Sequence, residues 1–248
     1  IKYVLDLRDF PGDPVESILT HDFEDIISDD EVEVVVEVMG GIEPAYTFVK
    51  RSILKGKSVC TSNKALVAKH GAELLRLAKE NNVNFLFEAS VGGGIPIIRP
   101  IIRSITSDKI QEITGILNGT TNYMLTKMSE EGLEYDDVLK DAQAKGYAER
   151  NPAADVEGHD TCRKIAILAS LATEKQVNFE DIYTEGITNI TKTDIDYVKT
   201  IGKVIKLVAT ASFDNEKVWA RVCPLILEKD NPLSTVNDVF NAIKLTGN

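Results

Sequence analysis

Residues 1–90 alternate short runs rich in β-branched residues with stretches whose apolar positions recur at helical spacing. This pattern predicts strands at 4–7, 32–39, 57–61 and 83–89, and helices at 44–56 and 71–81. Such alternation is typical of βαβ units, in which helices join parallel strands. The run 32–39, VEVVVEVM, is apolar enough to be a buried parallel strand. We therefore predict a doubly wound parallel sheet of the α/β class.

The pattern changes after residue 90, where Gly92, Gly93, Gly94 and Pro96 interrupt it. The following sequence predicts strands at 109–117, 204–213 and 218–227, and helices at 120–128, 135–145 and 161–172. The last two strands are separated by the polar residues 214–217, which is typical of an antiparallel pair with a short turn. We predict a second domain of mixed α+β type after residue 90.

Composition and charge exclude several classes of function. The 248 residues are 43% apolar and carry a net charge of −11, so neither nucleic acid nor an anionic membrane is expected as the main partner. Three widely spaced cysteines indicate packing thiols in a reducing compartment. No apolar run reaches the roughly 18 residues of a membrane span, and the first residues do not have the pattern of a signal peptide, so we expect a cytoplasmic protein. Both ends read as cuts in a longer chain.

A dinucleotide fold normally carries a GxGxxG loop after its first strand, where backbone N–H groups hold the pyrophosphate. The chain has no such loop. If residues 4–7 form the second strand, the first strand and its glycine loop belong upstream. Arg8 then follows the second strand, where a 2′-phosphate or the adenosine ribose is bound, which favours NADP over NAD. The alternative is a solvated surface arginine.

Two loops follow predicted strands. Ser62, Asn63 and Lys64 come after 57–61, at the edge where open α/β sheets bind ligands, although a lysine there is commonly only solvated. The stretch 88–96 holds three glycines, which free its backbone carbonyls to turn inward toward a hard monovalent cation or a cofactor. A flexible hinge between domains is the alternative.

The richest stretch for chemistry is 145–164, KGYAERNPAADVEGHDTCRK. Asp160 and Lys164 are four residues apart, so a helix places them on one face. By spacing alone this pair is a surface salt bridge. However, a loop with three further acids leads into the helix, and the combination suits a small substrate with an amino and a hydroxyl group. No histidine spacing supports a transition-metal site.

Six motifs, taken in their order along the chain, resemble homoserine dehydrogenases: VEVMGG (36–41), TSNKALVAKHG (61–71), FEASVGGGIPII (87–98), LNGTTNYML (117–125), KGYAERNPAADVEGHDTCRKIAILA (145–169) and NAIKLTGN (241–248). The resemblance runs through nearly the whole chain. It implies a partial dinucleotide-binding domain at 1–90, to which residues 233–248 lead back, and an α+β catalytic and dimerisation domain with a mixed sheet at 91–232. It also implies a homodimer.

The resemblance further implies NAD(P)-dependent interconversion of L-homoserine and L-aspartate 4-semialdehyde, in threonine, methionine and isoleucine biosynthesis. By position, the resemblance implies that Lys164 is the acid/base group and that Asp160 assists it. The substrate is expected to bind Glu149, Asp155 and Lys64. The cofactor, NADP or NAD, is expected to contact Gly40, Gly41, Ser62, Asn63, Lys64 and Arg8. A monovalent cation, Na⁺ or K⁺, is expected on the backbone carbonyls of Glu88, Val91, Gly93 and Ile95.

Three other functions remain open from the residues alone. A lysine among acids is also found in enzymes that form a Schiff base with an aldehyde. The chain is alternatively only a dimerising module, or part of another oxidoreductase whose upstream sequence carries a cysteine nucleophile.

Lysines of ordinary pKa, about 10.4, are charged at neutral pH, so a lysine acid/base predicts faster homoserine oxidation at high pH.

Overall fold

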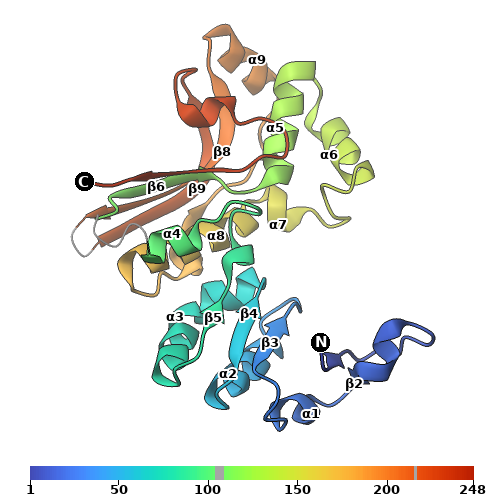
Figure 1. Ribbon diagram of the computed structural model, residues 1–248. Coiled ribbons are helices and arrows are strands. Elements are labelled where there is room, and N and C mark those ends of the chain that lie inside the picture. Colours follow the sequence, from blue (N-terminus) through green and yellow to red (C-terminus); the bar gives the residue numbers. More distant parts are fainter. Residues whose placement is uncertain (104–108, 215–216) are drawn as a thin grey trace. The chain divides into compact units, whose positions relative to one another are not determined.

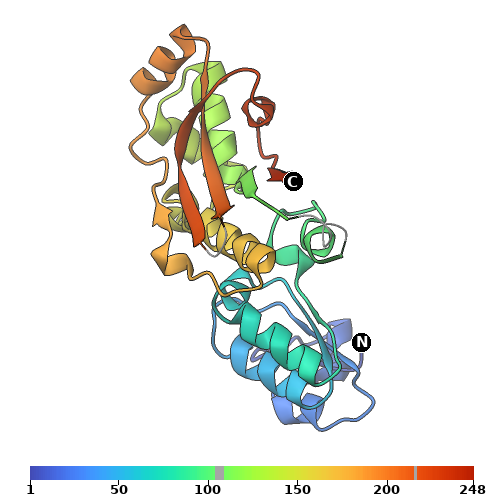
Figure 2. The same ribbon diagram turned by 90° about the vertical axis from the view of Figure 1, so that its left-hand side faces the viewer.

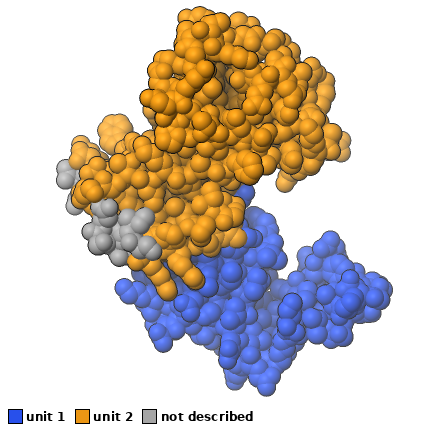
Figure 3. All heavy atoms as spheres, turned by 45° about the horizontal axis from the view of Figure 1, so that its top comes forward, with its two compact units in different colours: residues 1–87 blue, residues 88–248 orange. Residues whose placement is uncertain are grey.

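The computed structural model describes residues 1–103, 109–214 and 217–248. These residues divide into two units, Ile1–Phe87 and Glu88–Asn248 (Figure 3). We call them unit 1 and unit 2. None of the described helices combines the length and apolar character needed to cross a membrane.

Unit 1 contains two small parallel sheets (Figure 1). The first pairs β1 (Val4–Leu5) with β2 (Leu19–Thr20), and the second has the order β3 (Val34–Glu37), β4 (Ser58–Thr61), β5 (Phe85–Leu86). Its helices are η1 (Pro14–Ile18), α1 (Phe23–Ile27), α2 (Ala45–Leu54) and α3 (Lys64–Glu80). Because α2 joins β3 to β4 and α3 joins β4 to β5, the predicted βαβ alternation is confirmed.

Strand β3 is buried on one face only. Val35 packs against a cluster that includes Phe23 of α1 and Phe48 of α2. On the other face Val34, Val36 and Val38 are 55%, 66% and 75% exposed. The prediction of a strand buried on both faces is therefore wrong for the described residues, because helices lie against only one of its faces.

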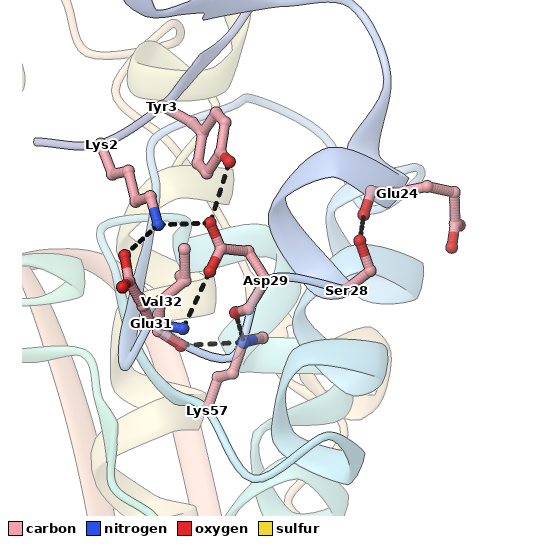
Figure 4. Close-up of polar contacts among 8 residues, drawn as sticks. All are labelled: Lys2, Tyr3, Glu24, Ser28, Asp29, Glu31, Val32 and Lys57. Atoms are coloured by element: carbon pink, nitrogen blue, oxygen red, sulfur yellow. Dashed lines mark hydrogen bonds and ion pairs between the residues drawn. The ribbon is translucent and has the colours of Figure 1, made fainter.

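A polar cluster ties the start of the chain and the start of β4 to the loop before β3 (Figure 4). Lys57 is buried and donates to the backbone oxygens of Asp29 at 2.6 Å and Val32 at 2.8 Å. The Asp29 carboxylate accepts from Lys2 at 2.6 Å and from Tyr3 at 2.9 Å. These donors, Lys2 foremost, lower the pKa of Asp29 to about 2. A lysine at the start of a strand thus serves here as a buried donor.

Unit 2 is built on a mixed sheet with the order β10 (Ala242–Thr246), β6 (Glu112–Ile116), β8 (Val204–Asp214), β9 (Lys217–Leu227), β7 (Tyr183–Thr184). Among the described strands of this sheet, β7 alone pairs in parallel with its neighbour. The predicted antiparallel pair is β8–β9, and residues 215–216 of its predicted turn lie outside the described residues. Strand β10 belongs to this sheet within unit 2.

The helices of unit 2 are η2 (Glu88–Ser90), α4 (Ile98–Arg103), α5 (Gly119–Glu131), α6 (Tyr135–Ala144), α7 (Ala153–Val156), α8 (His159–Thr173), η3 (Phe179–Asp181), α9 (Lys192–Thr200) and η4 (Pro232–Thr235). Helices α5 and α8 lie on the same side of the β8–β9 hairpin (Figure 2). Ile113, Ala209 and Val222 on that face are fully buried. On the opposite face Trp219 is 70% exposed. Part of the core of unit 2 therefore lies between the sheet and these two helices. A second buried cluster on the face of Trp219 joins Val208 and Leu227 to Leu233 of η4.

Candidate active site

Asp160 and Lys164 form a buried ion pair on α8. Gly158 precedes the helix with φ of 85°, a left-handed conformation that favours glycine. The Lys164 ammonium lies 2.7 Å from the Asp160 carboxylate, and the two side chains are only 13% and 6% exposed. The interpretation as a surface salt bridge is therefore wrong. A buried pair with further polar partners is the kind of arrangement that catalytic sites use.

The end of β6 supplies the further partners of this pair. Lys164 also donates to the backbone oxygen of Leu117 at 2.7 Å. The Asn118 amide donates to Asp155 at 2.7 Å and to Asp160 at 3.0 Å. Three residues predicted for the site, Asp155, Asp160 and Lys164, are thus brought together from α7 and α8.

Sequence reasoning did not single out Asn118. The signal was present, because asparagine directly before a helical pattern is a preferred N-cap. In the structure its side-chain oxygen accepts from the Thr121 N–H at 2.9 Å and so caps α5. Its nitrogen remains to bind the two acids.

Close backbone packing positions α7 beside the site. A side chain on Gly186 would place its Cβ 1.9 Å from the backbone oxygen of Val156, so only glycine fits there. The next N–H, of Ile187, donates to the same oxygen at 2.7 Å. This contact fixes the end of α7, the helix that carries Asp155.

Glu149 lies on the loop between α6 and α7, and its side chain is exposed. The loop is anchored at two points. Thr120 donates to the backbone oxygen of Tyr147 at 2.6 Å, and Gln143 donates to the backbone oxygen of Glu149 at 3.1 Å. The backbone beside Glu149 is therefore tied to α5 and α6, while the carboxylate is open to solvent.

In unit 1 a polar network joins the carboxyl ends of β3 and β4. The buried Glu37 accepts from Thr61 and from the backbone N–H of Met39, the latter at 2.6 Å. Asn63 caps α3 and donates to the backbone oxygen of Gly41 at 2.7 Å. Sequence reasoning missed Glu37, which lies within an otherwise apolar strand.

The other cofactor candidates of unit 1 lie around this network. Gly40 and Gly41 follow β3, and Gly41 has φ of 79°. Ser62 is exposed between β4 and α3, and Lys64 is the first residue of α3. These residues gather where open parallel sheets bind ligands.

Arg8 follows β1, and its side chain is 75% exposed. It binds the Asp6 carboxylate through two nitrogens, at 3.0 Å and 2.9 Å. This guanidinium lowers the pKa of Asp6 to about 2. Asp6 is therefore an ionised carboxylate whose charge Arg8 balances.

The glycine loop 88–96 turns sharply at Gly92 and Gly93, which have φ of 84° and 59°. The Glu88 carboxylate accepts from the backbone N–H groups of Ile98 at 2.8 Å and Arg99 at 2.9 Å, so it caps α4. A cation here would therefore be held by backbone carbonyls rather than by that carboxylate. Across residues 1–103, 109–214 and 217–248, no group of three or more His, Cys, Asp or Glu side chains is arranged to hold a metal.

Comparison with known proteins decides the family. The family model described as homoserine dehydrogenase matches residues 96–248, and the one described as its NAD binding domain matches residues 11–88. The chain belongs to the homoserine dehydrogenase family. The resemblance stated from the six motifs and the predicted fold class are both confirmed.

Individual relatives agree with the family models. Homoserine dehydrogenases of Synechocystis and Bacillus subtilis are 47% and 44% identical to the chain over 93% and 94% of it. The chain spans 54% of each, about half the length of these curated relatives. A homoserine dehydrogenase structure from Thiobacillus denitrificans has a TM-score of 0.88 at 40% identity, covering 93% of this chain and 53% of that one.

A hyperthermophilic archaeal homoserine dehydrogenase in complex with NADPH is also similar. Its TM-score is 0.80 at 31% identity, over 93% of this chain and 67% of that one.

Proposed function

We propose that this chain, within a complete homoserine dehydrogenase, catalyses the NAD(P)-dependent interconversion of L-homoserine and L-aspartate 4-semialdehyde. This is a step of threonine, methionine and isoleucine biosynthesis. The observation that carries the proposal is the buried Lys164 ammonium, held by Asp160 and by the Leu117 carbonyl. It lies in the part of the chain that matches the homoserine dehydrogenase family model.

Lys164 is the proposed acid/base group. A nicotinamide cofactor supplies or accepts the hydride when it is bound. In the direction of reduction, the Lys164 ammonium donates its proton to the alkoxide that forms at the aldehyde oxygen. In oxidation, neutral Lys164 takes the hydroxyl proton of homoserine. Asp160, one helical turn away at 2.7 Å, holds the ammonium in place.

The remaining acids are proposed to bind the substrate. Asp155 lies beside the ion pair, joined to Asp160 through Asn118. Glu149 projects from an anchored loop with its carboxylate accessible. Two carboxylates of this kind suit the amino group of homoserine. A rise in the KM for homoserine in Glu149→Gln checks this role.

Residues 1–90 are proposed as the cofactor domain, with residues 91–232 as the catalytic and dimerisation domain. The contacts of Gly40, Gly41, Ser62, Asn63 and Lys64 with the nicotinamide cofactor are supported by their place at the carboxyl ends of β3 and β4. The extent of cofactor contact with unit 1, measured by hydrogen exchange on NADPH addition, checks the assignment.

NADP is proposed as the preferred cofactor. Arg8 balances the charge of the Asp6 carboxylate, which would otherwise repel a 2′-phosphate, and the Arg8 side chain is accessible. The similar archaeal homoserine dehydrogenase was solved with NADPH. Comparing kcat/KM with NADPH and with NADH decides between the two cofactors.

A monovalent cation, Na⁺ or K⁺, is proposed on the backbone carbonyls of Glu88, Val91, Gly93 and Ile95. The positive φ angles of Gly92 and Gly93 support an inward turn of this loop. Monovalent cations suit a site built from neutral oxygens. Melting temperatures in Na⁺, K⁺ and tetramethylammonium salts of equal ionic strength test the proposal.

The homodimer is proposed to form through the exposed part of the unit 2 sheet face that carries Trp219, beyond the part that η4 covers. Trp219, Arg221 and Tyr183 are exposed on β9 and β7, and Lys244 is exposed on β10. The strand register places Tyr183, Arg221 and Thr210 in one row across the sheet. An open sheet face with an exposed tryptophan is typical of a surface that a partner covers.

Lys164→Ala in the complete protein tests the proposed function. We expect homoserine oxidation to fall by about 100-fold or more, with unchanged circular dichroism and NADPH binding, because the acid/base group is lost. Lys140→Ala is the control, since the Lys140 side chain is 76% exposed on α6. Near-normal turnover of Lys164→Ala would remove the mechanism. Borohydride added with the substrate should leave no covalent adduct, whereas a Schiff-base enzyme would be trapped.

A further inference from the structure

The Asn118 amide is engaged at both ends. Its oxygen accepts from the backbone N–H of Thr121 at 2.9 Å and from the Thr121 hydroxyl at 3.1 Å. Because a backbone N–H can only donate, the oxygen must face Thr121, and the amide cannot be turned around. The nitrogen therefore faces Asp155 and Asp160, at 2.7 Å and 3.0 Å. Asn118 is 5% exposed, so the arrangement is sheltered from water.

This geometry reduces the repulsion between two neighbouring carboxylates in the site. Asp155 and Asp160 both lie within hydrogen-bonding distance of one nitrogen, so the two carboxylates are close neighbours. Like charges at such distances repel, and this repulsion favours proton uptake by one of the acids. The amide nitrogen has two hydrogens, one for each carboxylate. It bridges the acids without adding a charge of its own.

The same segment also holds the lysine. The carbonyl of Leu117, the residue before Asn118, accepts from Lys164 at 2.7 Å. Asp160 therefore accepts from two donors on one oxygen, Lys164 at 2.7 Å and Asn118 at 3.0 Å. When Lys164 gives up its proton, Asn118 still donates to Asp160.

We infer that Asn118 is a positioning residue of the reaction: it keeps Asp155 and Asp160 ionised side by side and orients Asp160 toward Lys164. The inference rests on the proposed function, because it assigns Lys164 the proton transfer. Asn118 itself touches neither substrate nor cofactor in this role. It acts through the two acids.

Asn118→Ser separates this role from helix capping. Serine is also a good N-cap, so the cap on α5 is kept while the bridge to the acids is lost. Asn118→Asp also keeps the cap and nearly the same shape, but it replaces the donor by a third carboxylate. Asn231→Ser is the matched control, because Asn231 caps η4 through its bond from the Leu233 N–H.

Both Asn118 variants are assayed in the complete protein for homoserine oxidation across pH. We expect kcat to fall by about 10- to 100-fold in Asn118→Ser, and further in Asn118→Asp, because the acids and the lysine lose their orientation. At a pH where both carboxyls are ionised in the variant as well, the loss of one donor leaves more negative charge on Asp160, so Asp160 holds the Lys164 proton more tightly. The rise of kcat with pH should therefore move to higher pH in Asn118→Ser, while Asn231→Ser keeps the wild-type profile.

The outcomes separate the inference from the function on which it rests. A wild-type protein that does not oxidise homoserine removes the proposed function, and the inference with it. An active wild type with Asn118→Ser matching Asn231→Ser in kcat and pH profile overturns the inference alone. The inference is also overturned if the activity of Asn118→Ser falls only in proportion to its folded fraction, measured by circular dichroism, and its pH profile does not move. Loss of the helix cap alone would then explain the lower activity.

Discussion

Lys206 on β8 offers a sharp test of the energetics of unit 2. It is only 3% exposed, and its ammonium donates to Asn122 at 3.1 Å, Asn237 at 2.9 Å and the backbone oxygen of Val236 at 2.6 Å. Burial lowers its pKa from 10.5 to about 8, against the opposing charges of Glu130 and Asp238. This lysine joins β8, α5 and the segment after η4.

The magnitude and sign follow from proton linkage. A difference of about 2.5 in pKa corresponds to about 3.5 kcal/mol at about 1.4 kcal/mol per pKa unit. Between pH 8 and 10.5 the unfolded chain holds the Lys206 proton and the folded protein has released it. The unfolded state thus binds more protons there, so the free energy of unfolding rises with pH, by up to about 3.5 kcal/mol from this group. Below pH 8 its contribution is constant.

Lys206→Met removes both the charge and the three hydrogen bonds. We expect a loss of about 2–4 kcal/mol at pH 7.5, because buried acceptors are left without a donor. The deficit relative to wild type should then widen toward pH 10.5, since only the wild type gains stability from this lysine. Other titrating groups cancel in the difference between the two proteins.

Urea denaturation from pH 7.5 to 10.5 measures both effects. Circular dichroism and the fluorescence of Trp219, the one tryptophan of the sequence, follow the unfolding of unit 2. Lys140→Met is the control, and we expect it to stay within about 0.5 kcal/mol of wild type because Lys140 is exposed. A difference between wild type and Lys206→Met that stays flat across this pH range would refute the linkage argument.

Two further predictions concern packing and assembly. Gly186→Ala should destabilise the protein by about 2 kcal/mol or more and lower homoserine oxidation, because the new Cβ would lie 1.9 Å from the Val156 oxygen. A free energy of unfolding in urea equal to that of the wild type would contradict this packing argument. Trp219→Glu should shift the proposed homodimer toward monomer in sedimentation velocity, because it places a charge on the open sheet face where the tryptophan is 70% exposed. Unchanged sedimentation would show that the dimer forms elsewhere.

The sequence predicted elements well where the hydrophobic pattern was long and regular. Helix α6 and the hairpin β8–β9 lie within a residue or two of the predicted ranges. Helix α3 begins at Lys64 rather than 71, because Asn63 caps it and the first turn needs no apolar pattern of its own. Helix α9 was missed although Thr191 and Asp194 form a capping box.

The candidate site was predictable in its parts and not in its assembly. The spacing of Asp160 and Lys164 predicts that they meet on one helical face, and they do. Spacing cannot predict burial, which comes from the packing of α8 against α4, α7, β8 and β9. Nor can it predict that Asn118, 42 residues before Asp160, donates to that carboxylate. Contacts of this kind depend on tertiary packing, which one sequence does not encode as a local pattern.

The short segment 118–122, Asn-Gly-Thr-Thr-Asn, shows how much one motif connects. Asn118 binds the two acids, Thr120 donates to the backbone of Tyr147 and Asn122 donates to the backbone oxygens of Val236 and Phe240. Gly119 has no side chain because a Cβ would lie 2.6 Å from the Val239 oxygen.

The first turn of α5 therefore has the candidate site on one side and the segment 236–240 on the other. Lys206 binds this segment and Asn122 together. A change at Lys206 should consequently reach Asn118, one helical turn from Asn122, through a rigid helix rather than through a flexible loop. This coupling requires that Lys206→Met loses homoserine oxidation at a urea concentration where its unit 2 is still folded.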